Sequence, residues 1–207
     1  KGDFYVLMNN DIEVLQENWM EQMLSNCERK EVGIVGARLY YPDNTIQHAG
    51  LVIGIGGSLR GIGANLYQGM RRERSGYLHR AAFQMNYSAV TAALMMVQKE
   101  VYEKAGGFEE ELSVAFNDVD FCLRVKEMGY LIVYDPLVEA YHYESKSRGA
   151  EDSPEIVARF QSEIEFMRNR WEDLLKKGDP NYNIHFSRVR ADYSLGDPEV
   201  ILRQNRK

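Results

Sequence analysis

NDVDFCLRVKEMGYLIVYDP, residues 117–136, places an amphipathic helix directly before an apolar strand. Gly129 stands where the helix should end, as glycine often does just beyond a helix C-terminus. The same alternation occurs upstream, with strand patterns at 3–8, 32–41, 46–54 and 87–98 and helical patterns at 15–27 and 99–107. Strands that alternate with helices predict an α/β sheet with helices on both faces.

The first strand pattern, DFYVLMNND at residues 3–11, is an apolar run that ends in a polar turn. A run of this kind is typical of a strand buried on both faces, which needs a neighbour on each side. It starts almost at the first residue, and Lys1 stands where Met would begin a complete chain. We therefore expect a fragment whose upstream strands are absent.

Composition narrows the class of protein. The 207 residues, 44% of them hydrophobic, are enough to bury one sizeable core. The net charge of −6 offers no global basic field, so nucleic acid is an unexpected partner and an anionic ligand needs a local site. Cys27 and Cys122 fall on apolar helical stripes and predict buried free thiols, which fit a reducing cytoplasm. No signal peptide or membrane-spanning run is evident.

The character of the chain changes near residue 150. Pro154 suits the first position of a helix, and Gly178 suits its end. Between them lie apolar residues at steps of three and four: Ile156, Phe160, Ile164, Met167, Trp171 and Leu174. We predict a unit at 1–150 and, at 151–207, a long helix with an irregular arm. The helix either packs on the rest of the chain or binds a partner protein.

Residues 54–69, GIGGSLRGIGANLYQG, lack the Lys and Ser or Thr that a phosphate-binding P-loop requires after its last glycine. A flexible loop is the better interpretation. Gly56 and Gly57 are its candidate lid residues.

Three polar positions are candidates for chemistry, beginning with Asp11 in MNND. It follows a strand end, where ligands gather on α/β sheets, and its carboxylate could hold Mg²⁺ or Mn²⁺. The alternative is an Asx turn, in which Asn10 or Asp11 caps the turn into the next helix.

The acid pair Asp118 and Asp120 begins the helix of the opening stretch. Two residues apart, helical side chains point to nearly opposite sides, so one site cannot use both. Asp118 or Asn117 could be the N-cap, and Asp120 could form a surface ion pair with Arg124. A carboxylate at a helix start is also kept ionised by the helix dipole, as an accepting base requires.

His142 follows the strand of residues 130–136, and an imidazole beside a carboxylate suits Mn²⁺ better than Ca²⁺. A lone histidine is more often a structural hydrogen bonder than a metal ligand. That interpretation is kept for His48 and His79, and His185 is expected to be exposed.

Together these motifs resemble a known family. LMNNDIEV and AGGFEEELSVAFNDVDFCLRVKEMGYLIVYDPLVEAYHYESKSRG are similar to the second half of the GT-A catalytic domain of family 2 glycosyltransferases. Within that family they resemble the bacterial branch that builds rhamnose-containing and related surface polysaccharides. The resemblance runs in order from residue 2 to about 149, and the order of the motifs makes it specific although each alone is weak.

The resemblance assigns roles residue by residue. NND matches the DxD-type motif, which makes Asp11 the metal ligand and places Asn9 and Asn10 at the donor, with Asn9 replacing the usual first acid. FNDVD matches the motif whose second residue is the general base, which makes Asp118 the base. His142 matches the histidine that completes the metal site. Candidate acceptor contacts are Asn117 and Asp120.

The implied activity is inverting, metal-dependent transfer of a sugar from a nucleotide-diphosphate donor to a hydroxyl of a growing bacterial polysaccharide, with Mn²⁺ or Mg²⁺ as cofactor. The implied acceptor is a glycan or lipid-linked glycan, so the resemblance allows peripheral contact with the inner face of the plasma membrane. The alternative from another class is a catalytically silent scaffold with a GT-A-like fold in a polysaccharide synthesis complex.

Overall fold

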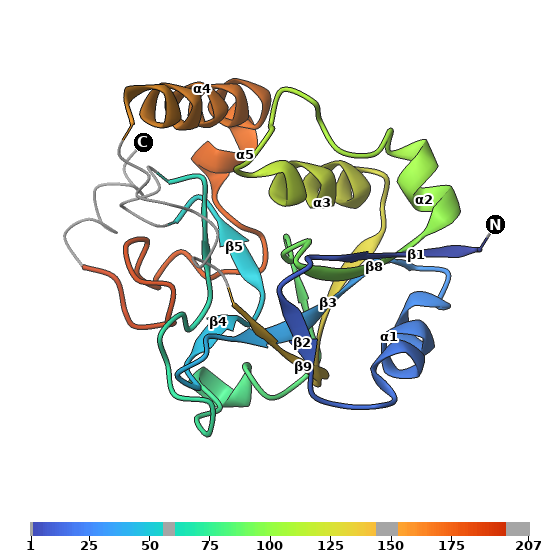
Figure 1. The fold of residues 1–207 in the computed structure, drawn as a ribbon. Coiled ribbons are helices and arrows are strands. Elements are labelled where there is room, and N and C mark those ends of the chain that lie inside the picture. Colours follow the sequence, from blue (N-terminus) through green and yellow to red (C-terminus); the bar gives the residue numbers. More distant parts are fainter. Residues whose placement is uncertain (1, 56–60, 144–152, 198–207) are drawn as a thin grey trace.

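The computed structural model describes residues 2–55, 61–143 and 153–197. Its main sheet has the strand order β1-β8-β3-β9-β2 (Figure 1), formed by Phe4–Met8, Leu94–Gln98, Val32–Tyr40, Leu131–His142 and Ile12–Val14. Strand β4, Ile46–His48, pairs with β3, and β7, Met85–Tyr87, pairs with β9. Among the described strands of this sheet only β3 and β9 run parallel, so the predicted α/β architecture is confirmed with a mixed sheet.

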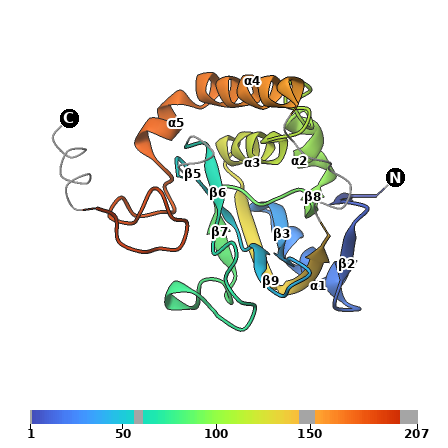
Figure 2. The same cartoon turned by 60° about the vertical axis from the view of Figure 1, so that its left-hand side comes forward.

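Helices cover both faces of this sheet, as predicted (Figure 2). Helix α3, Asn117–Glu127, packs on one face over β3 and β9, and α1, Trp19–Cys27, packs on the other. Every residue of β3 is buried, which explains its continuous apolar sequence. Two clusters of buried side chains result, one on each side of the sheet.

Strand β1 corrects the expectation of a strand buried on both faces. It pairs with β8 alone among the described strands, and Val6 and Met8 are 37% and 41% exposed. The absence of upstream strands stays a prediction.

Helix α1 is shorter than predicted because Leu15 does not belong to it. The chain leaves the MNND turn as a strand, β2, which pairs with the end of β9. The interpretation of Asn10 or Asp11 as the cap of a turn into a helix is therefore wrong.

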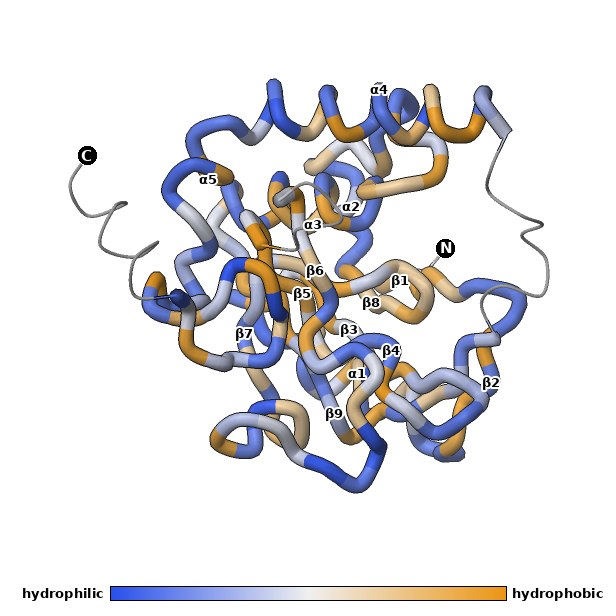
Figure 3. The backbone as a smooth tube through the Cα atoms, turned by 90° about the vertical axis from the view of Figure 1, so that its left-hand side faces the viewer, coloured by the Kyte–Doolittle hydropathy of each residue, from blue (hydrophilic) through white to orange (hydrophobic). Residues whose placement is uncertain are grey.

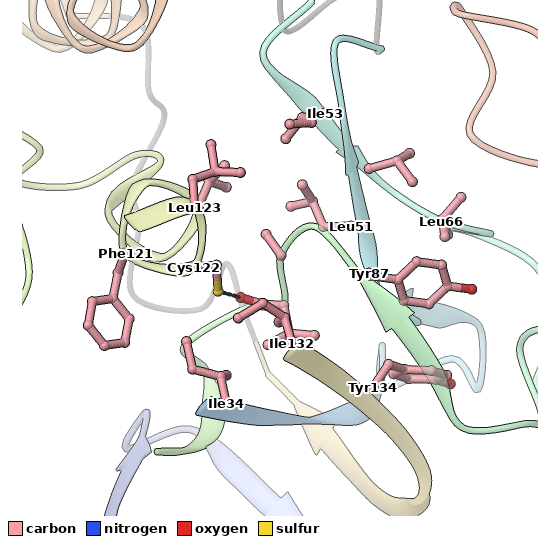
Figure 4. Packing of buried hydrophobic residues seen from close by; sticks show 14 of the residues in the cluster. Ile34, Leu51, Ile53, Leu66, Tyr87, Phe121, Cys122, Leu123, Ile132 and Tyr134 are labelled. Carbon is pink, nitrogen blue, oxygen red and sulfur yellow. Dashed lines mark hydrogen bonds between the residues drawn. The ribbon is translucent and has the colours of Figure 1, made fainter. Parts of the chain in front are cut away.

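Two predicted segments are subdivided. Strand β5, Leu51–Ile53, forms a hairpin with β6, Gly63–Asn65, so part of the glycine-rich segment is ordered strand. The expected strand at 87–98 is β7 and β8 with an irregular stretch between them. Figure 4 shows side chains of the hairpin region in one cluster with those of α3 and β9: Leu51, Ile53, Leu66, Leu123, Ile132 and Tyr134.

Helix boundaries follow the sequence signals closely. Helix α2, Lys99–Lys104, is followed by Gly106 and Gly107, and α3 by Gly129. All three glycines have positive φ, a conformation that other residues adopt at a cost. Both cysteines are buried and free, as predicted.

The C-terminal helical segment consists of α4, Pro154–Arg170, and α5, Glu172–Lys177, separated by a non-helical Trp171. Pro154 occupies the first turn behind the N-cap Ser153, and Gly178 ends α5. Figure 3 shows hydrophobic and hydrophilic residues alternating along α4. Its apolar residues Ile164 and Met167 join the same cluster as α3, so α4 packs on the rest of the chain. The division at residue 150 and a partner for this helix stay predictions. No helix within the described ranges is both long and apolar enough to cross a lipid bilayer.

Candidate active site

Asn9, Asp11 and His142 meet where β1 ends and β2 pairs with the last residue of β9. Ile12 lies opposite His142 in the β2–β9 ladder, and the Tyr143 amide donates to the Asp11 carbonyl at 3.0 Å. His142 Nε2 lies 3.2 Å from Asp11 Oδ1 and 3.2 Å from Asn9 Nδ2. Residues separated by more than 130 positions are thus brought into contact by strand pairing.

The hydrogen bonds of His142 define its tautomer. Its Nδ1 lies 2.7 Å from Oε1 of the buried Gln47, and a carbonyl oxygen can only accept, so Nδ1 carries the proton. Nε2 then presents a lone pair and accepts from Asn9 Nδ2. Asp11 Oδ1 is buried, accepts no hydrogen bond from the described residues and lies 3.2 Å from the same nitrogen. Two acceptor atoms this close repel each other, and a cation bound between them would turn that repulsion into attraction.

These residues are suited to bind a divalent cation whose coordination shell is completed by other ligands. An imidazole oriented by an Nδ1–H hydrogen bond is the usual form of a metal-binding histidine. Mg²⁺-type sites commonly use one or two carboxylates together with phosphate oxygens. Within the described ranges, no group of three or more His, Cys, Asp and Glu side chains could hold a metal by itself. The missing ligands would have to come from water or from oxygen atoms of a bound ligand.

A cavity of about 700 Å³ adjoins this cluster. Asn9 and His142 line it, together with Asn117 and Asp118 from the start of α3. Most of its other lining residues are of apolar type, among them Leu51, Ala92, Phe108, Val114, Phe116 and Phe160. The described lining contains no Lys or Arg, so those walls offer no cationic side chain to a diphosphate.

Asp118 is held by the segment that connects β7 to β8. Its Oδ2 accepts the Ala92 amide at 3.2 Å, and its Oδ1 accepts the Val119 amide at 2.8 Å. Burial raises the pKa of the Asp118 carboxyl above its ordinary value, against these amides and a Thr91 hydrogen bond, which lower it. A fixed carboxylate with a raised pKa is suited to accept a proton.

The start of α3 differs from both capping interpretations. Phe116, in the left-handed region at φ 63°, is the N-cap, and Asn117 and Asp118 are the first two helical residues. Asn117 Oδ1 accepts the Asp118 amide at 2.7 Å. Neither polar residue is the N-cap.

Asp120 points away from the cavity, in agreement with the predicted divergence of the acid pair. The predicted ion pair with Arg124 is present at 2.8 Å, but it is not on the surface, because the Asp120 side chain is 0% exposed. Trp171 Nε1 donates to its other oxygen at 2.9 Å. Asp120 is not among the described residues that line the cavity, and its contact with an acceptor stays a prediction.

The remaining candidates are placed as follows. Asn10 is exposed in the turn after β1 and is not part of the described lining. Gly56 and Gly57 lie outside the described residues. His79 is exposed and contacts Ser75, and His185 is exposed as expected.

Three supporting residues were not recognised in the sequence. Gln47 orients His142, Phe160 of α4 lines the cavity, and Glu163 of α4 binds the segment that leads to α3. Gln47 is a single amide with no motif around it. Both α4 residues belong to a stretch whose periodicity indicates only a packed helix.

His48 is the structural hydrogen bonder expected from the sequence. Its Nδ1 lies 2.6 Å from Asn65 Oδ1, and its Nε2 accepts the Thr91 amide at 3.3 Å. This neutral imidazole connects Asn65 and Thr91, which both line the cavity. Burial lowers the pKa of His48 from 6.5 to about 4.

We expect this histidine to make the stability of the chain depend on pH. Above pH 6.5 His48 is neutral in both states, and its contribution is fully present. As pH falls towards 4 the unfolded state binds the proton first, so about 3 kcal/mol of unfolding free energy is lost. In urea unfolding, His48→Gln should lose less unfolding free energy between pH 7 and pH 4 than wild type does. His185→Gln, at an exposed histidine, should show the same change of unfolding free energy with pH as wild type. An equal change in all three proteins would contradict the role of His48.

Comparisons with known proteins give partial likenesses. The chain is 46% identical over 199 residues to the uncharacterized protein y4gI of Sinorhizobium fredii, covering 96% of the chain and 21% of that protein. It is 34% identical over 194 residues to the O-antigen biosynthesis protein RfbC of Myxococcus xanthus, covering 94% and 15%. It is 27% identical over 81 residues to the N-acetylglucosaminyl-diphospho-decaprenol L-rhamnosyltransferase of Mycobacterium tuberculosis, covering 39% and 26%.

The chain thus spans about a quarter or less of each of these relatives. No family model matches it. The crystal structure of A197 from STIV is a weak structural neighbour, with a TM-score of 0.38 and 15% identity over 68% of this chain and 58% of that chain.

Proposed function

We propose that the chain is part of an inverting, metal-dependent glycosyltransferase of family 2 with a GT-A fold. It would move a sugar from a nucleoside-diphosphate donor to a hydroxyl of a growing bacterial polysaccharide. One observation carries the proposal: Asn9, Asp118 and His142 line one cavity, and Asp11 Oδ1 lies 3.2 Å from His142 Nε2. The names of two relatives, an O-antigen biosynthesis protein and a rhamnosyltransferase, add support.

In this proposal Asp118 removes the proton of the acceptor hydroxyl. The hydroxyl oxygen forms a bond to the anomeric carbon while the bond to the diphosphate breaks, and the diphosphate keeps that electron pair. Attack from the side opposite the leaving group inverts the anomeric centre. Asp11 and His142 would hold Mn²⁺ or Mg²⁺, which when bound supplies positive charge to the leaving diphosphate.

The experiment compares Asp11→Ala with wild type in the full-length protein, supplied with Mn²⁺, a panel of UDP-, dTDP- and GDP-sugars, and glycan acceptors. We expect metal-dependent release of nucleotide from one donor and its loss in the variant, because Asp11 contributes the only carboxylate beside His142 in the described cluster. Titration with Mn²⁺ alone should show that Asp11→Ala binds the metal more weakly than wild type does. Asp3→Ala, an exposed acid before β1, is the matched control and should behave as wild type.

The outcomes separate the enzyme from the silent scaffold. Turnover that is equal with and without metal, or unchanged in Asp11→Ala, would contradict the metal site. Neither turnover nor metal-dependent nucleotide binding in wild type would favour a scaffold in a polysaccharide synthesis complex.

A further inference from the structure

Glu163 lies on the inner side of α4 and is only 1% exposed. Its carboxylate accepts three hydrogen bonds from one short segment. Oε1 accepts the Val114 amide at 3.0 Å and the Ser113 hydroxyl at 3.2 Å, and Oε2 accepts the Ala115 amide at 3.0 Å. A buried carboxylate is costly unless it is fully hydrogen-bonded, so both oxygens are committed to this segment.

The segment that Glu163 binds leads directly into the candidate base. Val114 and Ala115 line the cavity, and the next residues are the left-handed Phe116 and then Asn117 and Asp118. Residues 113–116 form bends and belong to no strand or helix. Their path is therefore not determined by a regular backbone ladder. In Figure 1 the chain between α2 and α3 passes beside α4, where Glu163 supplies acceptors for two of its amides.

A second contact from α4 reaches the same segment. Phe160, one turn before Glu163, stacks on Phe116 with ring centroids 5.7 Å apart and an interplanar angle of 23°. Both rings line the cavity. Helix α4 thus contacts the segment at Ser113–Ala115 by hydrogen bonds and at Phe116 by ring stacking.

We propose that Glu163 is a positioning residue that fixes the segment 113–118 and, through it, the direction of the Asp118 carboxylate. This inference rests on the proposed function, in which Asp118 is the base. Two oxygens are required, because Oε1 and Oε2 accept from different donors and an amide can replace only one of them. Displacement of a catalytic group by about 1 Å can cost on the order of 10²-fold in rate.

A purely structural role for Glu163 makes a different prediction from a positioning role. If Glu163 only secured α4, its replacement would lower stability and leave the kinetics of the folded fraction unchanged. If it positions the base, kcat falls while the KM for the donor is retained, because Asn9 and Asp11 belong to the turn between β1 and β2 and His142 belongs to β9.

The test uses Glu163→Gln and Glu163→Ala, with Glu165→Gln as the control for an exposed acid on the same helix. Hydrogen exchange of the Val114 and Ala115 amides is measured without substrate, and kcat and donor KM are measured in the full-length protein. We expect faster exchange at both amides and kcat lowered ~10–100-fold in Glu163→Gln, further lowered in Glu163→Ala, with donor KM within about twofold of wild type. Glu165→Gln should match wild type in every measurement.

The isosteric Gln variant keeps the test decisive even if Glu163→Ala does not fold. Unchanged exchange, or faster exchange with unchanged kcat, overturns the positioning role. A further outcome is that wild type transfers no sugar while hydrogen exchange at Val114 and Ala115 still becomes faster in Glu163→Gln. In that case the proposed function is wrong, but Glu163 does fix the segment 113–118.

Discussion

Asp118→Asn should abolish sugar transfer by the full-length protein while leaving its affinities for metal and nucleotide nearly unchanged. An amide has the shape of the carboxylate and can keep the hydrogen bond from Ala92, but it cannot accept a proton from an acceptor hydroxyl. General-base catalysis typically contributes 10²–10⁴-fold, so a loss on the order of 10³-fold in kcat is expected. The measurement is steady-state turnover together with calorimetric titration of nucleotide in the presence of Mn²⁺.

Glu127→Gln at the exposed end of α3 makes the same chemical change outside the cavity and should retain turnover. The acid limb of the wild-type kcat/KM profile should lie above pH 3.8, because burial raises the pKa of Asp118 from that value and activity is lost as the base becomes protonated. Turnover retained in Asp118→Asn would refute the assignment of the base.

Asp120→Ala should lower the unfolding free energy of the chain by about 3–5 kcal/mol. The Asp120 carboxylate is fully buried and accepts from Arg124 Nε at 2.8 Å and Trp171 Nε1 at 2.9 Å, with Arg170 Nε at 3.3 Å. Its removal leaves the largely buried Arg124 without this acid and Trp171 without its acceptor. Because Arg170 and Trp171 lie at the end of α4, the change also loosens the packing of α4 on α3. Urea denaturation followed by circular dichroism measures the difference.

The exposed pair of Glu172 and Lys176 on α5 is the matched comparison. Both groups are largely in water, so Glu172→Gln should change stability by only about 0.3–0.5 kcal/mol. Equal losses of unfolding free energy in Asp120→Ala and Glu172→Gln would show that burial does not increase the contribution of Asp120 to stability.

Much of the fold could be predicted because its local signals agree with its tertiary structure. The apolar run of β3, the glycines after α2 and α3, and Ser153 with Pro154 before α4 each specify an element within a few residues. The failures arose where pairing between distant segments overrode local pattern. Helical spacing extended α1 back to Leu15, but pairing with β9 draws the preceding residues into β2.

The candidate site was predictable only in part for the same reason. Asp11 and Asp118 each stand at an element boundary that is visible in the sequence. The strand expected at 130–136 was predicted too short, because β9 continues to His142. Nothing local shows that His142 meets Gln47, or that Glu163 meets Val114 and Ala115. These contacts depend on tertiary packing, which periodicity cannot specify.

The long central strand β9 has a consequence for how the chain acquires its structure. It pairs with β2, β3 and β7, and the contacts of β2 with it join residues 12–14 to 140–142. The N-terminal strand β1 likewise pairs with β8, some 90 residues later. During synthesis these early strands have no partner within the described sheet until residues 94–98 and 131–142 have left the ribosome. Closure of such distant pairs is entropically slow, so we expect the β1–β8 and β2–β9 pairings, and with them the cavity, to form late in folding.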